Sequence, residues 1–222
     1  MQTKLEKQFT NSQLLRLLWP LVIEQALAAL VGMIALFGTV HISANAVANN
    51  LDNVGCIVGQ AMELAMITVV GRCIGAGDPD QAVHYTKKLM LWDYVVQGVA
   101  NALVIVGLPL LMQLYTLSPQ TDQLSRLLVI IHCGCGILLW PAAFVLPNAL
   151  RAANDVRFTM FVSVFSMVLW RLGFSYVLCV NMKMGAVGVW IAMVIDWVFR
   201  VLCFVIRFAR KKLRTRALPA KG

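Results

Sequence analysis

Six long apolar stretches, joined by short polar connections, constrain the fold of this chain more than any other feature. They are predicted at residues 14–37, 44–74, 84–112, 124–144, 158–180 and 185–208. Each can form a helix across the hydrocarbon core of a bilayer, which takes about 20 residues. Hydrophobic residues make up 60% of the 222 residues and charged residues only 13%, and a soluble chain of this length could not bury so much apolar surface. We therefore expect an all-α integral membrane protein whose six transmembrane helices form one lobe.

Lysine and arginine residues alternate between frequent and scarce along the connections. They are frequent before the first stretch, in the second and fourth connections and in the tail, and scarce in the first, third and fifth. The positive-inside rule then places both termini in the cytoplasm. We expect a cytoplasmic segment at residues 1–13, a single transmembrane lobe at residues 14–208 and a basic cytoplasmic tail at residues 209–222. Such a chain is a multi-pass protein of the plasma membrane, of the bacterial inner-membrane type.

The formal net charge of +9 does not indicate nucleic-acid binding. Seven cationic residues lie at or after the end of the last stretch: Arg207, Arg210, Lys211, Lys212, Arg214, Arg216 and Lys221. The positive-inside bias and contact with anionic lipid head groups account for such a run. No aromatic residues are interleaved with it, as a base-stacking surface would require. The expected partner is the lipid bilayer.

The cysteines and histidines show no metal-ligand spacing. All six cysteines, Cys56, Cys73, Cys133, Cys135, Cys179 and Cys203, fall in or beside apolar stretches, with no C-x-x-C pair. His132 is next to Cys133, but these positions do not converge on a metal. We expect buried thiols that act as small hydrophobes, no metal site and no cofactor. His41, His84 and His132 stand alone, and with no catalytic set in view the chain is not expected to be an enzyme.

The segment "GRCIGAGDPDQA" at residues 71–82 interrupts the apolar pattern. Its spacing, G-x-x-x-G-x-G, differs from the dinucleotide-binding pattern G-x-G-x-x-G, and no βαβ unit surrounds it. Gly75 and Gly77 can end one helix in a left-handed conformation. Asp78 can then cap the next helix, with Pro79 at its first position. We predict a cytoplasmic turn here, and residues 148–160 have the same plan of small residues followed by an aspartate.

The second stretch carries its polar residues on one side. At about 100° per residue, six positions lie within about 40° of a common line: Asn45, Asn49, Asp52, Cys56, Gly59 and Glu63. Such a stripe lines either a water-filled cavity or a seam of hydrogen-bonded helices, and its two carboxylates favour the cavity. We therefore assign the substrate or ion pathway to Asn45, Asn49, Asp52 and Glu63, together with Glu24 of the first stretch.

Ionisable residues also lie deep within other stretches. Glu24, Glu63, Arg171 and Asp196 fall near the middle of their spans, with Asp52 and Asp93 shallower. Such residues are costly in a bilayer and mark functional sites. A desolvated Glu24 can exchange a proton and so couple it to a cationic substrate; a structural hydrogen bond is the alternative. Asp196 can pair with Arg171 or with Arg200, one turn further along. We interpret this group as structural, with a role in ion coupling as the alternative.

Four segments in register resemble the multidrug and toxic compound extrusion (MATE) transporters, in particular their carboxy-terminal half. They are "TVHISANAVANNLDNV", "AMITVVGRCIGAGDPDQA", "PNALRAANDVRFTM" and "GAVGVWIAMVIDWVFR". Members of this family have two lobes of six helices each, so the resemblance implies that the six spans of this chain form one lobe. The segment "LLWPLVIEQALAALVGM" is more similar to the first helix of the amino-terminal lobe. We interpret the junction that follows as an internal deletion that fuses parts of the first and seventh helices.

The resemblance implies export of organic cations or drugs, driven by H⁺ or Na⁺ and carried out by alternating access. Glu24 lies where carboxy-terminal lobes carry a glutamate linked to cation coupling, and Arg151 and Asp155 match the family's R-x-x-x-D element. Glu63 has no counterpart in the family pattern. The expected protein is a half-size transporter that pairs with a second lobe, as a homodimer. The alternatives are a truncated, transport-inactive fragment and a non-transporting membrane scaffold.

Overall fold

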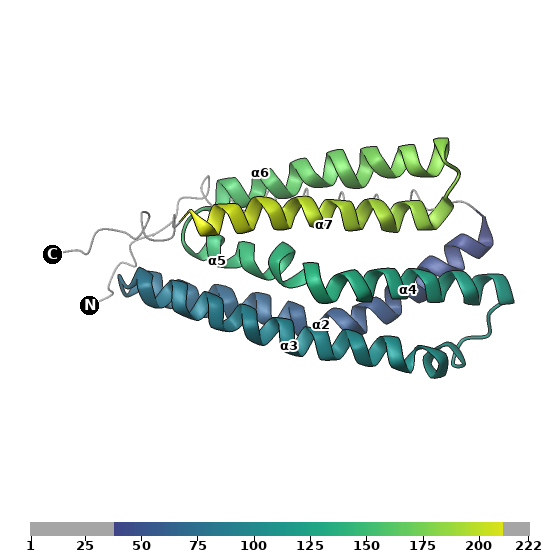
Figure 1. Ribbon diagram of the computed structural model, residues 1–222, viewed down its shortest axis with the longest axis horizontal. Coiled ribbons are helices and arrows are strands. Elements are labelled where there is room, and N and C mark those ends of the chain that lie inside the picture. The colour runs from purple at the N-terminus through teal and green to yellow at the C-terminus, as the bar shows by residue number, and fades with distance from the viewer. Residues whose placement is uncertain (1–37, 211–222) are drawn as a thin grey trace, which may run out of the picture.

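The structure is a computed structural model that describes residues 38–210 (Figure 1). Every regular element in that part of the chain is a helix. The elements are α2 (Thr39–Gly75), α3 (Pro79–Met112), α4 (Pro119–Trp140), η1 (Pro141–Val145), α5 (Leu146–Ala152), α6 (Val156–Ser166), η2 (Met167–Phe174), η3 (Val177–Asn181) and α7 (Gly185–Ala209). They make five segments long and apolar enough to cross a membrane. The predicted first span, residues 14–37, lies outside the described residues, as do residues 1–13 and 211–222.

The segment formed by α4, η1 and α5 lies between two helix pairs (Figure 1). It packs against α2 and α3 on one side and against α7 on the other, and α6 with η2 packs against α7. The largest apolar core joins α2, α3, α4 and α7 around residues such as Leu128 and Trp197. Large apolar side chains such as Leu103 and Val106 remain exposed on the outside of α3, as expected where lipid is the solvent.

The fourth span is longer than the sequence indicates. We predicted its end at residue 144, but the helix continues to Ala152. Pro141 cannot donate the usual helical hydrogen bond, and the chain accommodates it in the wider turn of η1, where the Leu146 N–H bonds to the Pro141 carbonyl. Asn148 and Arg151 therefore belong to a helix that follows directly from the fourth span, not to the connection after it.

The predicted turn between α2 and α3 is present, with one correction. Gly77 alone takes the left-handed conformation (φ 77°), whereas Gly75 is the last residue of α2. The Gly77 N–H bonds to the Ile74 carbonyl at 3.0 Å and the Asp78 N–H to the Cys73 carbonyl at 3.0 Å, which is the Schellman pattern of a helix end. Asp78 caps α3, as predicted, by accepting the Gln81 N–H at 2.9 Å. We call residues 76–78 the Gly77 turn.

Residues 153–155, which we call the Asn154 turn, repeat this backbone between α5 and α6. Asn154 takes the left-handed conformation (φ 64°). Its N–H bonds to the Arg151 carbonyl at 3.0 Å, and the Asp155 N–H bonds to the Leu150 carbonyl at 2.9 Å. The two turns predicted to share a plan therefore share a hydrogen-bonding pattern. Both lie at the same end of the bundle as the end of α7 (Figure 1).

Candidate functional site

Apart from Asn49, the polar stripe of α2 faces neighbouring helices. Asn45 accepts a hydrogen bond from the indole N–H of Trp190 in α7 at 2.9 Å. Asn49 is exposed, and its amide donates to the Asn45 carbonyl at 2.8 Å. Further along α2, Cys56 and Gly59 are buried, and Asp52 and Glu63 are partly buried. We call these residues, with the groups they contact on α3, α4 and α5, the polar seam.

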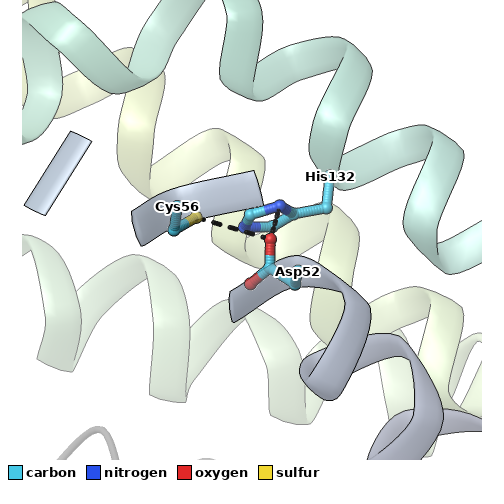
Figure 2. Close-up of side chains that lie close together, drawn as sticks. All are labelled: Asp52, Cys56 and His132. Atoms are coloured by element: carbon cyan, nitrogen blue, oxygen red, sulfur yellow. Dashed lines mark hydrogen bonds and ion pairs between the residues drawn. The ribbon is translucent and has the colours of Figure 1, made fainter. Parts of the chain in front are cut away.

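Asp52, Cys56 and His132 meet at the centre of the polar seam (Figure 2). The Cys56 thiol donates to Asp52 Oδ1 across 3.6 Å, one turn apart on α2. His132 comes from α4, and its Nδ1 lies directly against Asp52 Oδ1. Two expectations from the sequence are therefore wrong: His132 does not stand alone, and one cysteine does lie beside a histidine and a carboxylate.

Aromatic rings surround the His132 imidazole. Its ring centroid lies 4.7 Å from that of Trp197, 5.4 Å from that of Trp190 and 6.1 Å from that of Trp140, each in an edge-on arrangement. His132 is 2% exposed. Such packing holds the imidazole in one place and keeps its surroundings apolar, so that its polar contact is directed to Asp52.

The half of the seam nearer the Gly77 and Asn154 turns is built around Glu63. The Asn148 amide in α5 donates to Glu63 Oε2 at 3.5 Å and to the Phe144 carbonyl at 3.0 Å. Arg151 donates in turn to Asn148 Oδ1 at 3.0 Å. The fourth span must continue past Pro141 to bring Asn148 and Arg151 to this place. A carboxylate, an amide and a guanidinium are thereby connected across two helices.

Three residues of α3 complete the seam, and the sequence interpretation missed their importance. Asp93, Gln97 and Asn101 follow one another at intervals of four and are almost fully buried. Gln97 Oε1 accepts the Gly59 N–H of α2 at 2.9 Å. Neither carboxylate oxygen of Asp93 has a hydrogen-bond partner within residues 38–210. The i, i+4, i+8 spacing was the available signal, since it places all three on one helix face.

Two glycines of α2 permit the close packing of the seam. A Cβ at Gly55 would lie 2.8 Å from Asn101 Oδ1, and one at Gly59 would lie 2.5 Å from Trp140 Nε1. Gly55 and Gly59 form a G-x-x-x-G pair, a spacing that lets membrane helices approach closely. A side chain at either position would have to displace the side chain of Asn101 or of Trp140.

A second buried charge cluster connects α6 with α7. Asp196 accepts from Arg200 Nε, with both oxygens at 3.1 Å, and from the Ser166 hydroxyl. Arg200 also donates to the Ser163 carbonyl at 3.2 Å. Of the two pairings left open by the sequence, the one between Asp196 and Arg200 is therefore present. Arg171 lies in η2, and it is partly buried. Each charge in the Asp196–Arg200 pair is neutralised within the bundle, as a structural role requires.

Arg151 and Asp155, the two residues of the R-x-x-x-D element, lie in different environments. Arg151 contacts Asn148 in the polar seam. Asp155 lies in the Asn154 turn and accepts two hydrogen bonds from Arg207 of α7, at 2.7 Å from Nε and 3.0 Å from Nη2. The Arg207 guanidinium also lies over the Phe158 ring, 4.4 Å from its centroid. The element therefore joins the seam to the end of α7. Glu24, the remaining predicted pathway residue, lies outside the described residues.

Comparison with known proteins places this arrangement in context. Residues 20–177 match the sequence profile of the family described as MatE. The chain is 25% identical over 195 residues to the uncharacterized transporter YisQ of Bacillus subtilis (strain 168), covering 85% of this chain and 40% of that protein. It is 28% identical over 179 residues to the probable multidrug resistance protein NorM of Idiomarina loihiensis, covering 75% of this chain and 37% of that protein.

A third relative is the probable multidrug resistance protein NorM of Thermotoga maritima. It is 22% identical over 169 residues, which cover 76% of this chain and 36% of that protein. The chain thus spans 36% to 40% of the length of these relatives.

Proposed function

Because the chain belongs to the MatE family, whose members are transporters, we propose that it forms one lobe of an ion-coupled antiporter that exports organic cations. Its relatives include two proteins named as probable multidrug resistance proteins. The coupling ion is H⁺ or Na⁺. Substrate and ion exchange across the bilayer by alternating access, as in other transporters with sites near the middle of the membrane.

The observation that carries this proposal is the buried carboxylate of Asp93. Its side chain is fully buried between helices, and neither of its oxygens has a hydrogen-bond partner within the described part of the chain. Keeping an ionised carboxylate in such a place without a partner costs roughly several kcal/mol of free energy, as for other unpaired buried ions. Binding a proton or a metal cation removes that penalty. Asp93 is therefore suited to take up a coupling ion and release it when water reaches the seam.

An organic cation can use the same seam. A positively charged substrate neutralises a carboxylate as a proton does, so substrate and coupling ion compete and exchange follows. The indole of Trp140 lies beside Gly59 and Gln97, one helical turn from Asp93, and aromatic faces attract organic cations. This combination of buried acid and indole favours cationic, partly apolar substrates over anionic ones.

The distribution of basic residues supports a cytoplasmic location for both turns. Arg72, Lys87 and Lys88 flank the Gly77 turn, while Arg151 and Arg157 flank the Asn154 turn. Both turns lie at one end of the bundle (Figure 1), where the positive-inside rule predicts the cytoplasm. In this orientation a second lobe, related by a twofold axis along the membrane normal, would face this one. A homodimer is the simplest source of that lobe, and the mass of cross-linked chains in native-like lipid tests it; single chains alone would contradict pairing.

Transport by the purified full chain in proteoliposomes tests the proposed function. We expect efflux of a fluorescent organic cation that depends on an imposed H⁺ or Na⁺ gradient and that is lost in Asp93→Asn. Asp122→Asn is the matched control, because Asp122 pairs with Arg126 at 2.8 Å and its side chain is 33% exposed. The proposal is contradicted if the unmodified chain shows no gradient-dependent efflux. It is also contradicted if Asp93→Asn retains that efflux.

A further inference from the structure

The contact between Asp52, Cys56 and His132 brings together three different donors for a metal ion. A carboxylate oxygen, a thiol sulfur and an imidazole nitrogen all lie within 4.8 Å of one another. Asp52 and Cys56 are fixed one turn apart on α2, and His132 reaches them from α4 (Figure 2). Cys56 is 3% exposed and His132 2% exposed. The side chain of Asp52 is 16% exposed, which leaves a route by which an ion can approach.

We propose that Asp52, Cys56 and His132 bind a zinc-class divalent cation and that this ion holds α2 and α4 together. The donor set is the first argument. Thiolate, imidazole and carboxylate are the protein ligands of zinc. Na⁺, Mg²⁺ and Ca²⁺ prefer oxygen donors throughout. The proposed site is therefore selective by chemistry against the hard ions that are abundant around a cell membrane.

The spacing of the donors is the second argument. In a tetrahedral zinc site, bonds of about 2.0 Å to oxygen and about 2.3 Å to sulfur place those two atoms about 3.5 Å apart. The distance between Cys56 Sγ and Asp52 Oδ1 is 3.6 Å. An ion between them needs almost no movement along α2. On the α4 side, the imidazole of His132 must move back from Asp52 to admit the ion, because the two groups are in direct contact; each then bonds to the metal instead.

Charge balance is the third argument. On binding, the Cys56 thiol releases its proton to solvent and becomes a thiolate, while His132 binds as neutral imidazole. Thiolate and carboxylate together carry two negative charges, which cancel the two positive charges of the ion. The complex is then neutral, as a nearly closed site between membrane helices requires. Three protein ligands also leave a fourth tetrahedral position for water or another exchangeable ligand.

The packing around His132 supports the site from outside the ligand set. The indole rings of Trp140, Trp190 and Trp197 fix the imidazole, and such an apolar shell limits the access of water to a bound metal. Trp190 is itself held by its hydrogen bond to Asn45 on α2. The ligands are therefore supported mainly by α7, which carries Trp190 and Trp197 and packs beside the two helices that the ion would connect.

Cobalt substitution in the purified, chelator-treated full chain tests the proposal. We expect one equivalent of Co²⁺ to bind with a thiolate-to-metal charge-transfer band, and one equivalent of Zn²⁺ to displace it. Cys56→Ser should remove the band. His132→Gln and Asp52→Asn should weaken zinc binding by more than about tenfold, since changes to groups outside the ligand set already have effects of that size. Cys179→Ser is the matched control, a buried cysteine that lies on η3 near α7.

Several outcomes would overturn the inference. These are a chain that binds no Co²⁺, a band that persists in Cys56→Ser, and a band that is removed instead by Cys133→Ser or Cys179→Ser. Helical content and elution volume establish that each variant is folded. If Cys56→Ser does not fold, Asp52→Asn tests the same site with a near-isosteric change. Metal binding is measured without a gradient or a substrate. Loss of transport with intact zinc binding would contradict the proposed function alone, and the reverse result would contradict the metal site alone.

Discussion

The two turns at the basic end of the bundle have the same backbone but use their aspartates differently. In each, a residue in the left-handed conformation, Gly77 or Asn154, precedes an aspartate whose N–H bonds back to the end of the helix before it. Asp78 caps its own helix through the Gln81 N–H. Asp155 makes no such cap and instead binds Arg207, 52 residues further along the chain. One local plan therefore yields a local contact in one turn and a tertiary contact in the other.

The difference follows from what packs beside each turn. The side chain of Asp78 remains partly exposed, so the nearest donor is the backbone of its own helix. Asp155 is 4% exposed because the end of α7 covers the Asn154 turn and supplies a guanidinium. A motif thus specifies how a chain reverses direction, whereas the role of its charged residue depends on a neighbour that the motif does not contain.

The largest effect expected from this comparison is that of Asp155→Asn. The change leaves Arg207 without its charged partner at a place where the Arg207 side chain is only 18% exposed. Removing one member of a fully buried pair costs about 3 kcal/mol or more. This pair is only partly buried, so chemical denaturation in mixed micelles should show a smaller loss, of about 2 kcal/mol. Asp78→Asn is the matched control, because asparagine is an equally good helix cap. Equal losses in the two variants would show that both aspartates act locally.

A smaller effect is expected from Gly77→Ala. A Cβ at Gly77 meets no atom within 4 Å, but φ is 77°, and an L side chain in this region costs about 1–2 kcal/mol. Asn154→Gly makes the opposite change at the equivalent position and should alter stability by no more than a few tenths of a kcal/mol. Both are measured by the same denaturation experiment. A neutral Gly77→Ala would mean that the turn relaxes out of the left-handed conformation.

Among the destabilising changes, the smallest effect is expected from Asp78→Ala. This change removes the side chain that accepts the Gln81 N–H at 2.9 Å, and loss of such a cap costs about 1 kcal/mol. Hydrogen exchange at the start of α3 should increase, while protection at the start of α6 stays as it is. If exchange increased equally at both helix starts, the two turns would not be independent.

Much of the fold follows from residue patterns that act over a few positions. The positions of α2, α3 and α7, the cap at Asp78 and the pairing of Asp196 with Arg200 depend on hydrophobic length and on i, i+4 spacing, which sequence reasoning can read directly. The continuation of the fourth span past Pro141 could not be predicted in the same way. Proline disturbs a helix locally, but packing against α2 and α7 determines whether the helix ends there.

The candidate site was only half predictable. The stripe on α2 was visible, and the matching face of α3, with Asp93, Gln97 and Asn101, carried the same kind of signal. The partner of Asp52 was not visible, because His132 lies 80 positions away and its ring direction depends on indoles from two helices. Contacts between membrane helices join residues that are far apart in the sequence. No short pattern in a single sequence shows which helix faces meet.

The two glycines of α2 also bear on how a lobe of this kind can move. Gly55 and Gly59 leave space on α2 that is filled by side chains of α3 and α4, namely those of Asn101, Gln97, Cys133 and Trp140. Sliding α2 along either neighbour would force these side chains against the adjacent turns of α2, so relative translation of the three helices is disfavoured. We therefore expect α2, α3 and α4 to move as one body, with any opening and closing at the seam accommodated where α6 and α7 meet it.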